Sequence, residues 1–79
     1  MARYFFDIVC DGQVISDDDG LELRDAEQAR REAVAGARSM MAADLLSGVV
    51  ALNQRIEVRD GSGAMVLALP FEEAVEFQH

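Results

Sequence analysis

The sequence predicts an α+β fold with the element order ββαββ, in which one long helix packs on one face of a four-stranded antiparallel sheet. Three observations support this prediction. The chain opens with an aromatic and β-branched segment that ends in Asp-Gly, a capped helical pattern fills its middle, and two strand patterns joined by a glycine-rich turn follow. A length of 79 residues suits one small domain, so we expect a single domain over residues 1–79.

The first hairpin is expected over about residues 3–17. Arg3–Cys10 is rich in residues that favour strands. The Asp11-Gly12 pair that follows favours a type I′ turn, because both central positions of that turn need a positive φ. A short return strand, Gln13–Ser16, ends at the acidic run Asp17–Gly20, whose residues favour turns.

The helix is expected over about residues 26–47. Asp25 can cap its first turn and Gln28 can reach back to complete a capping box, while Gly48 supplies the stop. One face of this helix is mostly alanine, with larger residues toward its end, and we expect that face to pack on the sheet. The larger residues, which we expect to fill the wider end of the core, are Met40, Met41 and Leu45.

The second hairpin is expected over about residues 54–70. Ile56 and Val58 alternate with charged residues, which is typical of a strand with one wet face. After a turn at residues 60–63, Ala64–Leu69 is nearly all apolar, which favours a central strand covered on both sides. Pro70 ends this strand, and residues 71–77 are interpreted as a C-terminal turn.

Strand alternation divides the sheet residues into two faces. Tyr4, Phe6, Ile8, Ile56, Val58, Met65, Leu67 and Leu69 are expected under the helix. One helix cannot cover both faces, and an apolar centre ringed by charges is typical of a protein interface. We therefore predict an interaction surface on the other face, formed by Phe5, Asp7, Val9, Arg55, Glu57, Arg59 and Val66.

The charge and apolar patterning exclude several partners. Fifteen acidic residues against seven basic ones give a net charge of −8, which repels phosphate backbones and anionic membrane surfaces. We therefore expect no nucleic acid and no membrane as a partner. The longest apolar run falls far short of the roughly 20 residues that span a bilayer.

Cys10 is the only cysteine, so an internal disulfide is impossible and a cytoplasmic location is expected.

No catalytic signature is present, so we expect a protein that is not an enzyme and needs no cofactor. Cys10 is expected to point into the core, and the only histidine that could activate it is His79 at the end of the chain. The acidic cluster at Asp17–Glu22 has the wrong spacing for an EF-hand, since Ile15 and Ala26 would fall on its first and last ligand positions. We interpret the cluster as a solvated turn and expect no metal site.

Several segments nevertheless look familiar: Arg3–Phe6, Asp11-Gly12, Asp19–Leu23, Ile56–Asp60 and Leu69–Phe71. Together they resemble a family of small bacterial domains of unknown function, and the resemblance spans nearly the whole chain. Members often carry His directly after the two Phe residues, where this chain has Asp7. The resemblance implies a standalone cytoplasmic protein and no assigned reaction.

These observations favour a non-enzymatic interaction module that pairs with itself or with another protein. We expect a homodimer formed through the free sheet face or a sheet edge. The alternative is an acidic inhibitor or antitoxin-like protein that binds a basic partner protein. In outline the chain is similar to small acidic domains of the HicB antitoxin type.

Overall fold

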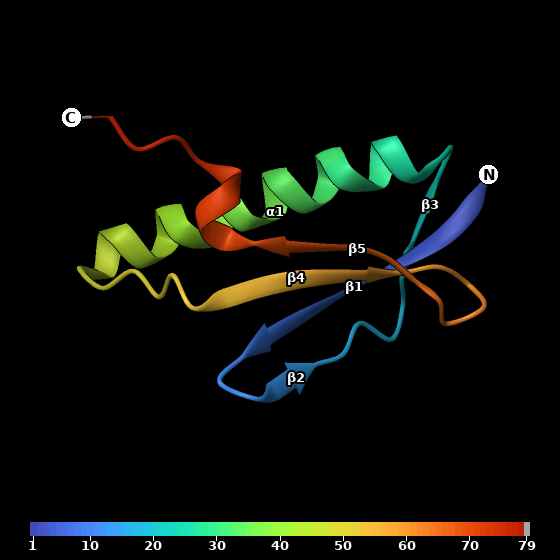
Figure 1. The fold of residues 1–79 in the computed structure, drawn as a ribbon, viewed down its shortest axis with the longest axis horizontal. Helices are drawn as coiled ribbons and strands as arrows, with labels where there is room; N and C mark the ends of the chain where they lie inside the picture. The colour runs from blue at the N-terminus through green and yellow to red at the C-terminus, as the bar shows by residue number, and fades with distance from the viewer. Residues whose placement is uncertain (79) are drawn as a thin grey trace.

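The computed structural model describes residues 1–78 and lays one long helix along an antiparallel sheet (Figure 1). His79 lies outside the described residues, so its role is not addressed by the structure. The predicted α+β fold and ββαββ outline are confirmed, with one short strand in addition. In chain order the elements are β1 (Ala2–Cys10), β2 (Gln13–Ile15), β3 (Leu21–Leu23), α1 (Ala26–Ser47), β4 (Gln54–Arg59), β5 (Met65–Pro70) and the 3₁₀ helix η1 (Phe71–Ala74).

The additional strand, β3, shares the edge of β1 with β2. The sheet has the order β2-β1-β4-β5, and β3 pairs with the N-terminal half of β1, where Tyr4 lies opposite Leu21. The C-terminal half of β1 pairs with β2, with Ile8 opposite Ile15. Our interpretation of residues 21–23 as a lead into the helix missed this strand, because three residues carry little local signal and their partner lies far away in the sequence.

The prediction that the last strand is central is wrong. β5 lies at the margin of the sheet and pairs only with β4 among the described residues. A β-bulge between Val58 and Arg59 also shifts the start of β5, so that Met65 lies opposite Arg59. Met65 is 58% exposed and does not pack under the helix as its parity predicted.

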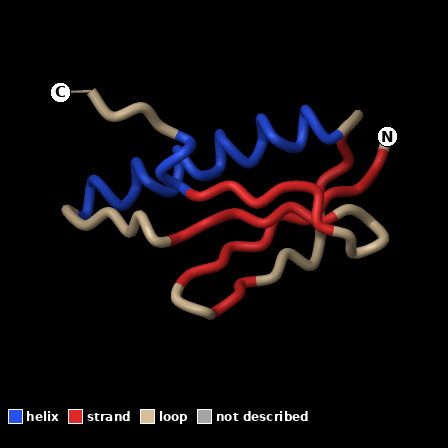
Figure 2. The backbone as a smooth tube through the Cα atoms, in the orientation of Figure 1, coloured by secondary structure: helices blue, strands red, loops and turns tan. Residues whose placement is uncertain are grey.

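The core lies between α1 and the helix-facing side of the sheet (Figure 2). Ala29, Ala33 and Ala37 are fully buried, and their small side chains let α1 lie close to β4 and β5. Phe71 and Val58 are the largest fully buried side chains in the described residues. The predicted apolar face of the helix therefore packs on the sheet, with alanine at the closest approach.

The wider end of the core differs from the prediction. Met41 is buried as expected, but Met40 is 36% exposed and Leu45 is 68% exposed. Figure 1 shows that the last turns of α1 extend past the ends of the strands, so the end of the helix that carries Leu45 has no sheet beneath it. Met40 instead borders an open groove beside α1 that Phe6 and Ile8 also line. An apolar helix face is buried only as far as its partner extends.

Both helix ends lie where the sequence predicts, but the Gln28 side chain bonds the N–H one residue before the N-cap and not the N-cap N–H of a capping box. The Asp25 carboxylate accepts a hydrogen bond from the Gln28 N–H at 2.9 Å, and the Gln28 side chain accepts one from the Arg24 N–H at 2.8 Å. Gly48 ends the helix in the left-handed conformation, with φ 91°. Within residues 1–78, no helix combines the length and the apolar character needed to cross a membrane.

Candidate functional site

The seven predicted interaction residues lie on three neighbouring strands. Six of them form cross-strand pairs between β1 and β4, and the seventh, Val66, lies on β5 beside the bulge. Residues opposite each other in an antiparallel pair share a face of the sheet. The three pairs are Phe5 with Arg59, Asp7 with Glu57, and Val9 with Arg55.

The centre of this face is less open than the sequence suggests. Val9 is 4% exposed and Asp7 is 6% exposed, while Phe5 is half-buried. The exposed part consists mainly of Arg55 on β4 and of Val66, which is 36% exposed. The expected apolar patch is therefore largely filled by its own neighbours, and it offers little free apolar area to a partner.

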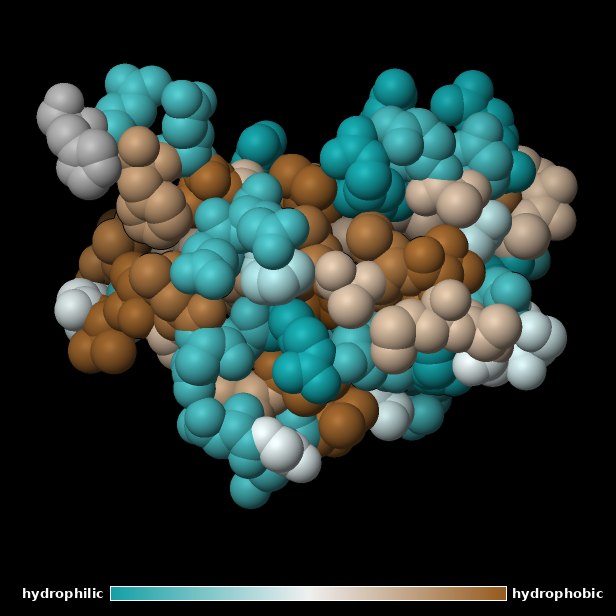
Figure 3. Space-filling view, viewed as in Figure 1, coloured by the Kyte–Doolittle hydropathy of each residue, from teal (hydrophilic) through white to brown (hydrophobic). Residues whose placement is uncertain are grey.

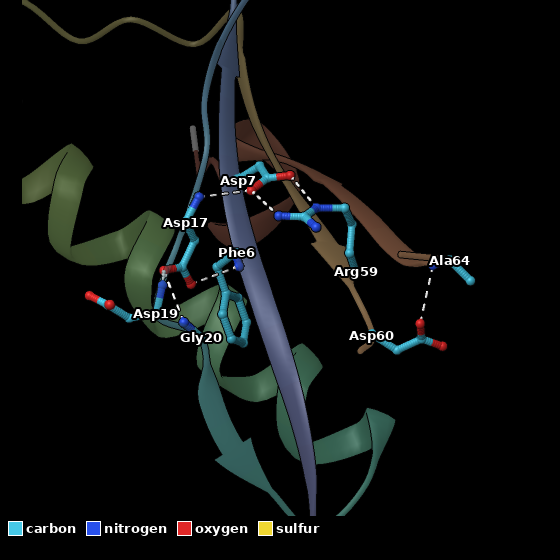
Figure 4. A network of polar contacts seen from close by, with 8 residues as sticks. All are labelled: Phe6, Asp7, Asp17, Asp19, Gly20, Arg59, Asp60 and Ala64. Carbon is cyan, nitrogen blue, oxygen red and sulfur yellow. Dashed lines mark hydrogen bonds and ion pairs between the residues drawn. The ribbon is translucent and has the colours of Figure 1, made fainter. Parts of the chain in front are cut away.

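A partly buried ion pair between Asp7 and Arg59 organises the face (Figure 4). Two hydrogen bonds join the groups: Arg59 Nε donates to Asp7 Oδ2 at 2.6 Å, and a second guanidinium nitrogen donates to Oδ1 at 3.0 Å. These bonds from Arg59 hold the pKa of Asp7 below its usual value, against the opposing effect of burial. The guanidinium also lies 5.2 Å from the centre of the Phe5 ring.

Asp17 extends this network to the sheet edge. Its N–H donates to Asp7 Oδ1 at 2.9 Å, while its carboxylate accepts the Phe6 N–H at 3.1 Å, in the gap between β2 and β3. The N–H groups of Asp19 and Gly20 donate to the other carboxylate oxygen. Burial opposes ionisation, but these backbone bonds lower the pKa of Asp17 overall.

The sequence analysis treated Asp17 only as a turn residue and missed its long-range bond. An aspartate followed by Asp-Asp-Gly does indicate that the side chain bonds to nearby backbone N–H groups. The bond to Phe6 carries no such local signal, because it depends on how the loop returns to β1. Asp17 in effect supplies the acceptor that a continuous partner strand would have supplied.

Gly20 completes the loop at a site where no side chain fits. Its φ is 72°, and a Cβ added there would lie 2.8 Å from Arg3 Cγ and 2.9 Å from Phe5 Cε1. The same Cβ would lie 3.0 Å from the Tyr4 carbonyl oxygen. Glycine is therefore required twice, by the backbone conformation and by the close approach of β1.

The carboxylates on this face are engaged in hydrogen bonds within the chain. Asp7 and Asp17 already accept several hydrogen bonds each, and the described residues contain no cluster of three potential metal ligands. Cys10 is half-buried rather than fully in the core, and its thiol donates to Asp11 Oδ2 at 3.8 Å. Desolvation and the Asp11 carboxylate raise the pKa of this thiol, which disfavours the nucleophilic thiolate.

An apolar groove lies beside α1, on the opposite side of the sheet from the ion pair. It has a volume of about 280 Å³ and opens where α1 leaves the first strands uncovered. Its lining is apolar apart from Glu32 and Ser39, and includes Phe6, Ile8, Leu21, Met40 and Ile56. Neither Asp7 nor Glu57 reaches it, so the groove does not bring two acids together for acid–base chemistry.

Comparison with known protein families gives a match over most of the chain. The model of a family described as "Domain of unknown function (DUF6894)" matches residues 3–72. The search of curated proteins gives no match, and neither does the search of solved structures. The matched range runs from the second residue of β1 to the second residue of η1, and it includes β2 to β5 and α1 in full.

Proposed function

The chain belongs to this DUF6894 family of unknown function, and from its structure we propose that it is a non-enzymatic protein-interaction module that forms a homodimer through the open edge of its sheet. The observation that carries the proposal is β5, an apolar strand at the margin of the sheet. An edge strand presents unpaired N–H and C=O groups, which is a common basis for strand addition.

The hydrogen bond of the Phe6 N–H shows in which direction the main-chain groups of β1 are oriented. This N–H points toward the β2 side, where it donates to Asp17. Main-chain groups alternate direction along an antiparallel strand. The odd-numbered residues of β1 therefore bond to β4, at registers such as Asp7 opposite Glu57.

The same alternation fixes which groups of β5 are free. The main-chain N–H and C=O of Val58 in β4 are directed toward β5, where Val58 lies opposite Leu67. Ala68, the next residue, therefore points its N–H and C=O away from β4 and toward the open margin. Ala68 is itself exposed, and Figure 3 shows hydrophobic side chains gathered in a band across the region of β5.

The opposite edge of the sheet is protected against pairing. It consists of two strands of three residues each, interrupted by the loop at residues 16–20. Five acidic residues and no basic residue lie between Asp11 and Glu22. Short strands, interruptions and charges are the usual means of blocking edge-to-edge association. By contrast, β5 is interrupted only at its ends, by the bulge near Met65 and by Pro70.

Measurement of the mass in solution tests this proposal. We expect the particle mass to rise from 8.6 kDa toward twice that value as protein concentration increases, measured by light scattering or sedimentation. Ala68→Pro removes the outward N–H without breaking a bond to β4, and should weaken association by about tenfold or more. Ala68→Val keeps the N–H and should associate as the wild type does. A strict monomer at every concentration contradicts the proposal.

The acidic edge supports a second candidate function, binding to a basic partner protein in the manner of an inhibitor or antitoxin. Asp11, Asp18, Asp19 and Glu22 are all exposed along the β2 and β3 edge. A concentrated negative surface accelerates association with a basic protein and orients it. The test is whether the chain relieves growth arrest by a small basic toxin encoded beside it, and whether Asp18→Lys with Asp19→Lys abolishes the relief.

We also propose a bacterial cytoplasmic location. Cys10 is the only cysteine and is free, so the fold depends on packing and not on an oxidising compartment. Fractionation of the native cell with an antibody to this chain tests the location.

A further inference from the structure

The geometry of the open edge points to a defined pairing: we infer that β5 pairs antiparallel with β5 of a second copy, with Ala68 opposite Ala68. This inference rests on the proposed function and specifies its interface. Because an antiparallel pair of identical strands is related by a twofold axis, one segment can supply both halves of the contact. The sheet would then continue from one copy into the next.

Ala68 is the natural centre of such a pair. It lies between the bulge at the start of β5 and Pro70, which has no N–H to donate. Its own N–H and C=O both point outward, as the register of β4 with β5 requires. Two copies of Ala68 facing each other exchange two main-chain hydrogen bonds.

The neighbouring side chains fit this register. With Ala68 at the centre, Leu67 of one copy lies beside Leu69 of the other, on the side of the sheet that carries α1. Leu67 is half-buried in the single chain and already packs against the core. On the opposite face, Val66 lies beside Pro70 of the second copy, and the pairing would cover part of the exposed apolar surface of both.

The charge distribution selects a second copy at this edge and not at the other. Two chains of net charge −8 repel each other overall, so their association is least opposed where acidic residues are absent. The eleven residues Gly61–Phe71 include no charged side chain. The β2 and β3 edge, with five acids between Asp11 and Glu22, would bring like charges together.

Cysteine cross-linking tests the pairing directly. In a Cys10→Ser background, Ala68→Cys should form an intermolecular disulfide on mild oxidation, since hydrogen-bonded partners have Cα atoms about 5.5 Å apart. Val66→Cys is the matched control on the same strand and face. In this register the two copies of Val66 are offset by about 14 Å, so cross-linking should be about tenfold slower.

The outcomes distinguish the Ala68 register of the β5 pairing from homodimer formation itself. Faster cross-linking of Ala68→Cys than of Val66→Cys supports the register. Efficient cross-linking of Val66→Cys, or of Ile15→Cys on β2, with a dimeric mass would overturn the pairing and leave the homodimer standing. A monomeric wild-type mass with no cross-linking at any of the three positions would overturn both.

Discussion

At the scale of single residues, the loop between β2 and β3 is held by carboxylates that act as backbone acceptors. Asp17 accepts N–H groups from Phe6, Asp19 and Gly20, and its own N–H donates to Asp7. Asp7 in turn binds Arg59 of β4. The chain of bonds therefore joins the edge loop to the second strand inward, and its strength depends on both acids remaining ionised.

We predict that Asp7→Asn lowers the free energy of unfolding by about 2 kcal/mol at neutral pH. This loss is smaller than that expected for a fully buried pair, because the Arg59 side chain remains 32% exposed. Urea unfolding measures the change. Glu57→Gln is the control on the same face: its pair with Arg55 is more exposed, so the loss should stay below about 1 kcal/mol.

Asp7→Asn also changes how the free energy of unfolding depends on pH in acid. The pKa of Asp7 is lowered in the folded chain, so its contribution is complete above the ordinary value of 3.8 and disappears as the pH falls toward the folded pKa. Wild-type stability should therefore fall below about pH 4, and Asp7→Asn should reduce that fall without abolishing it. Asp17, Glu27 and Asp60 also have lowered pKa values and contribute to the remainder. An unchanged slope in the variant contradicts this assignment.

The two glycines of the first hairpin region provide a separate test. Gly20 and Gly12 have similar φ values, 72° and 77°, but only Gly20 has atoms within 4 Å of an added Cβ. Gly12→Ala should cost about 1 kcal/mol from backbone conformation alone. Gly20→Ala should cost at least about 2 kcal/mol, because Arg3 and Phe5 must also move. Equal losses in thermal or urea unfolding would show that the close approach contributes nothing.

At the scale of secondary-structure elements, η1 closes the core after β5. Phe71 is 0% exposed, and Arg38 of α1 donates to the Ala74 carbonyl at 2.6 Å. The short C-terminal turn is therefore attached to the helix by both packing and a hydrogen bond. Its start at Phe71 agrees with the predicted turn after Pro70, but the 3₁₀ helix ends at Ala74 and does not extend to residue 77.

We predict that Phe71→Ala lowers the free energy of unfolding by about 3 to 5 kcal/mol, since it removes one of the two largest fully buried side chains. Phe77→Ala is the matched control, because Phe77 is 59% exposed and its loss should cost less than about 1 kcal/mol. Denaturant unfolding monitored by circular dichroism compares the two variants. Similar losses would mean that η1 does not close the core.

How far the sequence predicts each element depends on how local its signals are. The bounds of α1 follow from Asp25 and Gly48, which act within one turn of the helix. The Asp11-Gly12 turn has the predicted positive φ at both positions. The position of β5 at the margin and the pairing of β3 with β1 depend on contacts between distant segments, which alternation within one strand does not encode.

The same contrast between local signals and distant contacts applies to the candidate site. Alternation correctly places Asp7, Val9 and Arg59 on the face opposite the helix. It does not indicate that Asp7 and Arg59, 52 residues apart, form an ion pair, or that Val9 is nearly covered. Side-chain direction follows from the local pattern, whereas burial and partners follow from strand order and loop position.

At the scale of the whole molecule, the net charge of −8 predicts how association depends on salt. Added salt screens the repulsion between two acidic copies, so dimerisation should strengthen by about threefold to tenfold between low and high ionic strength. Sedimentation equilibrium in increasing NaCl measures this. Binding of a basic partner to the acidic edge should instead weaken with salt, so the sign of the dependence separates the two proposed functions.

The loop between β2 and β3 also bears on which way β3 faces. Between the pairs Ile8 with Ile15 and Tyr4 with Leu21, the returning chain advances by six residues while β1 advances by four. Residues 16–20 are not strand, so the loop accommodates the two extra residues and the alternation of β2 does not continue into β3. The orientation of Leu23 is set instead by the pairing of β3 with β1, where a shift of one residue would turn Leu23 outward and Glu22 inward. By bonding to Phe6 and Asp7, Asp17 therefore helps to fix the register of a strand to which it does not belong.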